Sequence, residues 1–254
     1  MRLTVISLSV ALLISIAANV CIFRQGKDFY LRLNAVRLDP LGLACYPATA
    51  RQQNTVPSDR RTVVFFGTSR ANHWTAPSGL TSFRFINRGI DNQTSAQVRG
   101  RFDYHISSLK PDMIILVVGG NDLKTIPLFP HRKESIIENC KSNVAELVSE
   151  SLDIGATVVL PTIFPTGEIP LTRRPFWSAG EVAGAGEEVN AFLYSLEREN
   201  VIVFDTIPIL VNESGFVKKE YSRDFLHLTK AGYDALNAEL IPVLKNWALY
   251  RRKK

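Results

Sequence analysis

The sequence contains a serine, an aspartate and a histidine whose types and spacing suit nucleophilic catalysis. Ser69 directly follows the apolar run 63–66 and its glycine-containing turn. Much later in the chain, Asp224 precedes His227 by three residues. An aspartate so placed can accept a hydrogen bond from one ring nitrogen, and the other nitrogen can then remove a proton from a hydroxyl. Taken singly, Ser69 would suit a helix N-cap and the Asp224–His227 pair an exposed polar loop.

Two other turns carry donors that could bind a substrate oxygen. Gly89 lies in the stretch Asn-Arg-Gly-Ile-Asp after a second apolar run, and a glycine leaves its backbone N–H unobstructed. Asn121 follows two glycines after a third run, and its side-chain amide can donate two hydrogen bonds. Either residue could instead serve only to shape its turn.

His73 is an alternative base, because it stands four residues after Ser69. If both residues lie on the helix that follows the turn, His73 is one turn further along and points away from the donors. We therefore favour His227. His73, His105 and His131 are scattered and no cysteine pair accompanies them, so the sequence predicts no metal site and requires no cofactor.

The elements that must bring these turns together alternate along the chain. Apolar runs rich in β-branched residues predict strands at 62–66, 83–87, 113–118, 157–160 and 201–204. Helical periodicity predicts helices at 95–109, 133–152, 181–199 and 229–247. Strands that are apolar on both faces and alternate with helices indicate a three-layer α/β/α domain with a five-stranded, mainly parallel sheet. In such a sheet, ligands bind at the carboxyl ends of the strands, where the candidate residues lie.

In type and order, these features resemble the four sequence blocks of the SGNH hydrolases, also called GDSL-type esterases and lipases. The resemblance extends over 62–244 and is strongest at Asn-Arg-Gly-Ile, at Lys-Pro-Asp leading into Gly-Gly-Asn-Asp, and at Asp-Phe-Leu-His-Leu followed by Ala-Gly-Tyr. One departure stands next to the serine, where Thr68 replaces the aspartate of the usual Gly-Asp-Ser. That change affects the turn geometry and efficiency more than the class of reaction.

The resemblance implies a flavodoxin-like SGNH fold and a serine esterase mechanism. Ser69 would attack an ester carbonyl, His227 would take its proton, and Asp224 would orient the imidazole. The N–H groups of Ser69 and Gly89 and the amide of Asn121 would form the oxyanion hole.

The long loop after the fourth predicted strand is a candidate substrate-contact element. Trp177 could stack on a sugar ring, and Arg173 and Arg174 could bind an anionic group. An equally good interpretation is a proline-stiffened surface loop whose aromatic residues pack against the domain.

The amino-terminal segment predicts membrane insertion. Residues 3–23 carry no charge. As a helix, a run of this length is about what a ~30 Å bilayer core requires. The segment is either a signal anchor or a cleaved signal peptide, since Ser15–Ala17 offers small residues at a suitable spacing. We expect a signal anchor or peptide at 1–23, a proline-containing spacer at 24–60 with at most a short helix, and the catalytic domain at 61–250. That domain would lie outside the cytoplasm, anchored to the membrane, or be secreted if the segment is cleaved.

Charge and cysteine content argue against two further features, nucleic-acid binding and a disulfide. The net charge is +6, but seven of the 30 basic residues and none of the 24 acidic residues lie in the terminal stretches 1–27 and 251–254, so the body is nearly neutral. Nucleic-acid binding is therefore not expected. Cys140 falls on the apolar stripe of a predicted helix, which favours a buried thiol over a disulfide with Cys45.

Three functions remain open at this level. The first is a serine esterase that removes a small acyl group, such as acetate, from a glycan or lipid. The second is an envelope O-acyltransferase with the same triad, and the third is a non-catalytic binding module on the same fold. The sequence does not indicate an oligomeric state.

Overall fold

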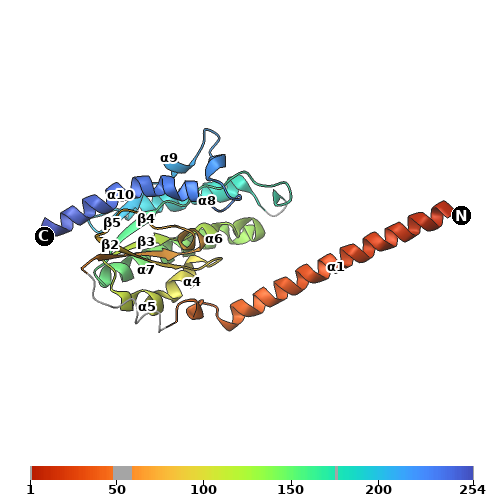
Figure 1. The fold of residues 1–254 in the computed structure, drawn as a ribbon, viewed down its shortest axis with the longest axis horizontal. Coiled ribbons are helices and arrows are strands. Elements are labelled where there is room, and N and C mark those ends of the chain that lie inside the picture. Colours follow the sequence, from red (N-terminus) through yellow and green to blue (C-terminus); the bar gives the residue numbers. More distant parts are fainter. Residues whose placement is uncertain (1, 48–58, 175–176, 254) are drawn as a thin grey trace. The chain divides into compact units, whose positions relative to one another are not determined.

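The computed structural model describes residues 2–47, 59–174 and 177–253 of the chain. These residues divide into two compact units, Met1–Ala44 and Cys45–Lys254. The first unit contains the amino-terminal helix and the second contains the whole of the α/β domain (Figure 1).

Helix α1 (Arg2–Leu38) dominates the first unit and buries none of its side chains. It is long and apolar enough to cross a membrane. The helix extends well past residue 23, so the first part of the predicted spacer is helical rather than irregular. No proline interrupts the chain before Pro40, and a proline disfavours the helical conformation of the residue before it, which accounts for an end at Leu38.

Five parallel strands form the sheet of the second unit, in the order β2-β1-β3-β4-β5. Their bounds are β1 (Arg61–Gly67), β2 (Phe83–Gly89), β3 (Met113–Val117), β4 (Thr157–Pro161) and β5 (Val201–Phe204). This is the flavodoxin-like order, with its switch point between β1 and β3. The predicted five-stranded sheet is confirmed, and every strand pair in it is parallel.

Alternate residues of the strands supply two separate cores. Val64, Phe66 and Leu116 belong to one core, together with residues of α4, α7 and α8. Val63, Phe65 and Ile115 belong to the other core, together with α10. Because both faces of each central strand are covered, the strands read as continuous apolar runs. The predicted three-layer arrangement is confirmed (Figure 1).

The helices of the domain follow the expected order. They are α3 (Ser69–Asn72), α4 (Ser95–Gly100), α5 (Phe102–His105), α6 (Gly120–Leu123), α7 (Lys133–Asp153), α8 (Ala179–Ser195), α9 (Ile207–Leu210) and α10 (Lys230–Lys253). The single helix predicted over 95–109 is instead broken after Gly100, where Arg101 leaves helical geometry at φ −112°. Glycine has a low helix propensity, and Arg101 turns its fully buried guanidinium toward the sheet edge, where it donates to the carbonyls of Gly67 and Arg88.

The cysteines are free thiols. Cys140 is fully buried on α7 and burial raises its pKa, whereas Cys45 is exposed. The buried thiol predicted from the apolar stripe of this helix is therefore present.

Candidate active site

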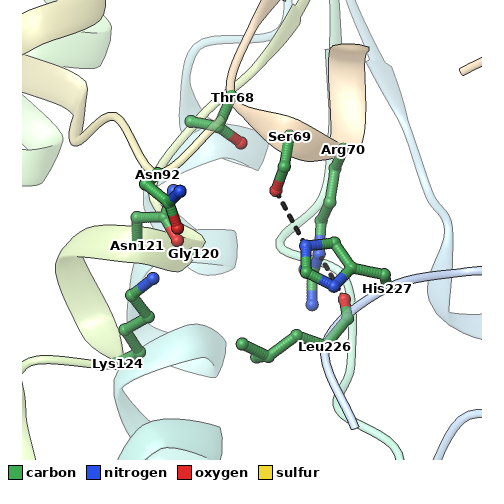
Figure 2. A pocket seen from close by; sticks show the side chains of 9 residues that line it. All are labelled: Thr68, Ser69, Arg70, Asn92, Gly120, Asn121, Lys124, Leu226 and His227. Carbon is green, nitrogen blue, oxygen red and sulfur yellow. Dashed lines mark hydrogen bonds between the residues drawn. The ribbon is translucent and has the colours of Figure 1, made fainter. Parts of the chain in front are cut away.

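Ser69, His227 and Asp224 lie within hydrogen-bond distance of one another. The Oγ of Ser69 is 3.1 Å from Nε2 of His227 (Figure 2). On the other side of the ring, Nδ1 of His227 is 2.9 Å from Oδ2 of Asp224. If Nδ1 carries the proton and donates to Asp224, Nε2 is free to accept the serine proton. Ser69 and His227 come from opposite ends of the domain, 158 positions apart in the chain. Their meeting at one site agrees with the prediction from the sequence.

Asp224 is held in place by backbone donors as well as by the imidazole. The N–H groups of Leu226 and His227 donate to its Oδ1 at 2.8 and 2.9 Å. Partial burial alone would raise the pKa of Asp224, but these two bonds and the charge and hydrogen bond of His227 lower it below 3.8 overall. The aspartate is therefore ionised at neutral pH, which suits it to orient an imidazole.

The turn that presents Ser69 depends on a glycine. Gly67 has φ +144°, and a Cβ at this position would lie 2.0 Å from the carbonyl oxygen of Val117. Thr68 follows it, donates its N–H to that carbonyl at 3.0 Å, and precedes Ser69 as the N-cap of α3 without a side-chain cap bond. The departure from Gly-Asp-Ser is therefore compatible with the sharp turn that exposes the Ser69 hydroxyl.

Asn121 lies near Ser69, on the short helix α6 that follows strand β3. Its Nδ2 donates to the carbonyl of Gln93 at 2.8 Å, which uses one of the two amide hydrogens. The next residue, Asp122, is buried and accepts from both the N–H and the hydroxyl of Ser95, which ties α6 to α4. Asn121 is thus fixed with one N–H still available for a ligand.

The structure does not support Gly89 as an oxyanion donor. Its N–H already donates to Oδ1 of Asn87 at 2.8 Å, and it does not line the cavity at Ser69. A Cβ on Gly89 would lie 2.1 Å from the backbone nitrogen of Asn72, so the glycine permits α3 to pack closely on β2. The predicted glycine is therefore a packing residue, as the turn interpretation allowed.

Asn92 lines the cavity where Gly89 was expected. It has φ +63°, a left-handed conformation that asparagine tolerates better than most residues. The pair Asp91-Asn92 was the available sequence signal, because these residue types favour such turns, but the donor predicted from the sequence was the nearby Gly89.

A small cavity of about 40 Å³ lies in front of Ser69. Figure 2 shows the Ser69–His227 pair on one side of it and Asn92, Asn121 and Lys124 on the other. The lining residues are Thr68, Ser69, Arg70, Asn92, Gly120, Asn121, Lys124, Leu226 and His227. They follow β1, β2 and β3 and precede α10, so the cavity lies at the carboxyl edge of the sheet beside the switch point.

Arg70 secures the loops around this cavity. It is 8% exposed, and its guanidinium donates to the carbonyls of Leu226, Phe164 and, at 3.4 Å, Pro165. Burial lowers the pKa of Arg70 to about 10, with Tyr233 and Asp224 opposing the shift, so the group remains a cation at neutral pH. It joins the loop that carries His227 to the loop after β4.

The imidazole of His73 is not bonded to the hydroxyl of Ser69, although the backbone N–H of His73 donates to the Ser69 carbonyl at 2.9 Å. Its Nε2 lies 3.6 Å from Oδ2 of Asp91, and its ring meets the ring of His227 edge-on with centroids 5.5 Å apart. The expectation that His73 points away from the oxyanion donors agrees with this placement. It contacts the candidate base rather than the nucleophile.

The residues suggested for substrate contact do not line the cavity. Arg173 and Arg174 are exposed, and the backbone N–H of Arg173 and the side chain of Arg174 bond carbonyls of their own loop. Trp177 packs edge-on against Phe225, with ring centroids 5.1 Å apart, and against one hydrophobic core. The surface-loop interpretation fits these placements better, because the aromatic ring is packed down.

Among the residues that the structure describes, no group of three or more His, Cys, Asp or Glu side chains could hold a metal ion. The chemistry available at the cavity is that of a hydroxyl, an imidazole and hydrogen-bond donors.

A sequence profile of the GDSL-like Lipase/Acylhydrolase family matches residues 51–235. The chain belongs to this family. Membership identifies the GDSL-like chain as a hydrolase that acts on ester bonds. No curated protein sequence matched it in a direct search.

Solved structures share the fold of this GDSL-like hydrolase. A GDSL-like lipase from Bacteroides thetaiotaomicron is similar with a TM-score of 0.65 and 22% identity, over 81% of this chain and 98% of that one. A lipase/acylhydrolase from Enterococcus faecalis has a TM-score of 0.51 and 19% identity, over 73% and 96%. An acetylxylan esterase from Geobacillus stearothermophilus, solved as a catalytic mutant, has a TM-score of 0.55 and 17% identity, over 73% and 94%.

Proposed function

We propose that this GDSL-like hydrolase is a membrane-anchored serine esterase that removes short acyl groups through an acyl-enzyme on Ser69. The observation that carries the proposal is the continuous chain of hydrogen bonds from Ser69 Oγ through His227 to Asp224. A serine hydroxyl is a weak nucleophile, and a base in this geometry activates it.

In the first half-reaction, Ser69 Oγ bonds to the ester carbonyl carbon and its proton passes to Nε2 of His227. The carbonyl oxygen becomes an oxyanion, which accepts from the N–H of Ser69 and the free amide hydrogen of Asn121. Asn92 lies beside them in the lining of the cavity. The bond to the leaving oxygen then breaks, and His227 returns the proton to that oxygen to release the alcohol.

In the second half-reaction, water attacks the acyl-enzyme while His227 accepts its proton. The acid departs, and the proton returns to Ser69. Asp224 orients the imidazole and stabilises its protonated form throughout.

The size of the cavity supports a short acyl group. The space of about 40 Å³ in front of Ser69 is small and opens to solvent, so it suits a short acyl group better than a long one. A small acyl group on a glycan or lipid alcohol fits this limit, because the alcohol part can remain outside. An acetylxylan esterase has the same fold, although at 17% identity that likeness extends to the fold alone.

Hydrolysis of 4-nitrophenyl acetate and its longer-chain analogues by the full chain in detergent tests the proposal. We expect turnover of the acetate and short-chain esters, a steep decline with chain length, and loss of activity in both Ser69→Ala and His227→Ala. His131→Ala, which changes an exposed histidine outside the cavity, is the control. Activity that survives in Ser69→Ala would refute the serine mechanism.

A further inference from the structure

The charges that line the cavity at Ser69 are unbalanced. Of the nine described residues around it, Arg70 and Lys124 are cationic and none is acidic. The nearest carboxylates, Asp91, Asp122 and Asp224, lie outside this lining, and each is held by a hydrogen bond to its own neighbours. A concave site lined by one sign of charge attracts ligands of the opposite sign.

Arg70 contributes charge to the cavity but is committed to the protein. Its three bonds to backbone carbonyls hold the loops together, and its guanidinium lies over the ring of Phe164 at 5.0 Å from the centroid. It has no carboxylate partner among the residues that the structure describes. The charge of Asp224 acts on it without a direct ion pair, and few of its donors remain for a ligand.

Lys124 is the cation that can bind a ligand directly. It is half-buried, and its ammonium forms no ion pair or hydrogen bond with the described part of the chain. It stands three residues after Asn121, and Figure 2 shows its nitrogen directed toward Asn92 and Asn121. Burial, followed by the charge of Arg70, lowers the pKa of Lys124, with Asp122 opposing the shift. A bound anion would offset both the burial and the repulsion.

The position of Lys124 indicates which part of the substrate it would meet. The leaving oxygen must lie near Nε2 of His227, because that nitrogen returns the proton. Lys124 lies across the cavity from His227, on the side of Asn92 and Asn121 (Figure 2). Two groups of a bound ester point away from the leaving oxygen. The carbonyl oxygen is taken by Asn121 and the Ser69 N–H, which leaves the acyl chain to reach Lys124.

We infer that the acyl group of the substrate is short and ends in an anionic group, such as a carboxylate, that pairs with Lys124. This inference rests on the proposed function, since it assigns the substrate class of the same site. The reacting carbonyl would occupy the small cavity at Ser69, and the acyl group of a small dicarboxylic half-ester would extend from it toward Lys124.

Two 4-nitrophenyl esters of matched shape test the inference. The hemisuccinate ends in a carboxylate, and the 4-methylpentanoate has two methyl groups in place of the carboxylate oxygens. We measure kcat/KM for both with the full chain in detergent and subtract the rates with Ser69→Ala, because the hemisuccinate also hydrolyses spontaneously. The wild-type protein should prefer the hemisuccinate. Lys124→Met should lower the charged-to-neutral ratio of kcat/KM by about tenfold or more, mainly through a higher KM, and Lys124→Arg should retain much of it.

Lys245→Met controls for the loss of one positive charge, because Lys245 is exposed on α10 away from the cavity. It should leave the ratio unchanged. A ratio that Lys124→Met does not alter, or equal losses on both esters, would overturn the inference while leaving the esterase proposal intact. Ser69-dependent hydrolysis of neither ester, nor of 4-nitrophenyl acetate, would overturn both.

Discussion

At the scale of single residues, Asn121 is the proposed oxyanion donor whose side chain is best fixed by the structure. One of its amide hydrogens is used by the carbonyl of Gln93, and the other is available to the cavity. Donors of this kind are typically worth about 3 kcal/mol of transition-state stabilisation. We therefore expect Asn121→Ala to lower kcat for 4-nitrophenyl acetate by about 100- to 1,000-fold with little change in KM.

The control for that variant is Asn143→Ala, whose side chain lies on α7 and bonds Ser95 rather than the cavity. It should retain kcat. A loss in Asn121→Ala that appears only as a higher KM would contradict the assignment, because the donor would then bind substrate and transition state equally.

The ionisation of Asp224 links its hydrogen bonds to stability. Its pKa in the folded protein is lowered below 3.8, so the folded state binds this proton less readily than the unfolded chain. The stabilisation is present above the unfolded pKa and is lost as the pH falls through the lower folded pKa. Asp224→Asn should therefore lower the free energy of unfolding at about pH 6, and the difference from wild type should shrink toward about pH 3.

Urea unfolding at both pH values measures this difference. Because the side chain of Asp224 is 45% exposed, we expect a modest effect. A difference that grows on acidification would show that the carboxyl pKa is raised rather than lowered.

The sequence predicted the meeting of Ser69, Asp224 and His227 because each follows or precedes a strongly patterned element. It did not predict Asn92, because a left-handed backbone conformation at a non-glycine residue leaves only a weak compositional signal. It also did not show that Asn87 would occupy the N–H of Gly89, since that bond depends on the fold of a single turn.

At the scale of elements, Gly89 shows how strand β2 and helix α3 fit together. An added Cβ would lie within 3 Å of three backbone atoms of Ala71 and Asn72, which cannot move without shifting the helix that begins at Ser69. Overpacking of this kind costs about 1–3 kcal/mol, so Gly89→Ala should lower the Tm measurably. Gly180→Ala, where α8 leaves open space, should not.

Circular dichroism melts measure both variants. An unchanged Tm in Gly89→Ala would contradict the packing role.

The presence of each strand was easier to predict from the sequence than the residues at which the helices begin, break and end. The five strands are short, apolar on both faces and bounded by turn residues, so their positions agree with the prediction to within about two residues. The break at Gly100 was not predicted, because it depends on Arg101 reaching the carbonyls of Gly67 and Arg88 across the sheet edge. The continuation of α1 to Leu38 was also missed, because the uncharged run ends at Phe23 and the spacer was expected to begin at Arg24.

At the scale of the whole molecule, the amino-terminal helix is expected to determine where the esterase works. Residues 3–23 of α1 are uncharged and span about 32 Å as a helix, which matches a bilayer core. The full chain should therefore remain with membranes through a carbonate wash, and a variant with Leu12→Arg and Ile16→Arg should be released. The mass of the mature amino terminus shows whether the segment is retained. Recovery of the unaltered, uncleaved chain in the soluble fraction would refute the anchor.

The central claim is that Ser69 is a nucleophile activated by His227, and covalent labelling tests it most directly. We would treat the full chain with an alkyl fluorophosphonate and locate the adduct by peptide mass spectrometry. The account predicts a single adduct on Ser69, formed rapidly in the wild-type protein, greatly slowed in His227→Ala and absent in Ser69→Ala. Labelling at another serine, or at Ser69 with equal speed in His227→Ala, would contradict it.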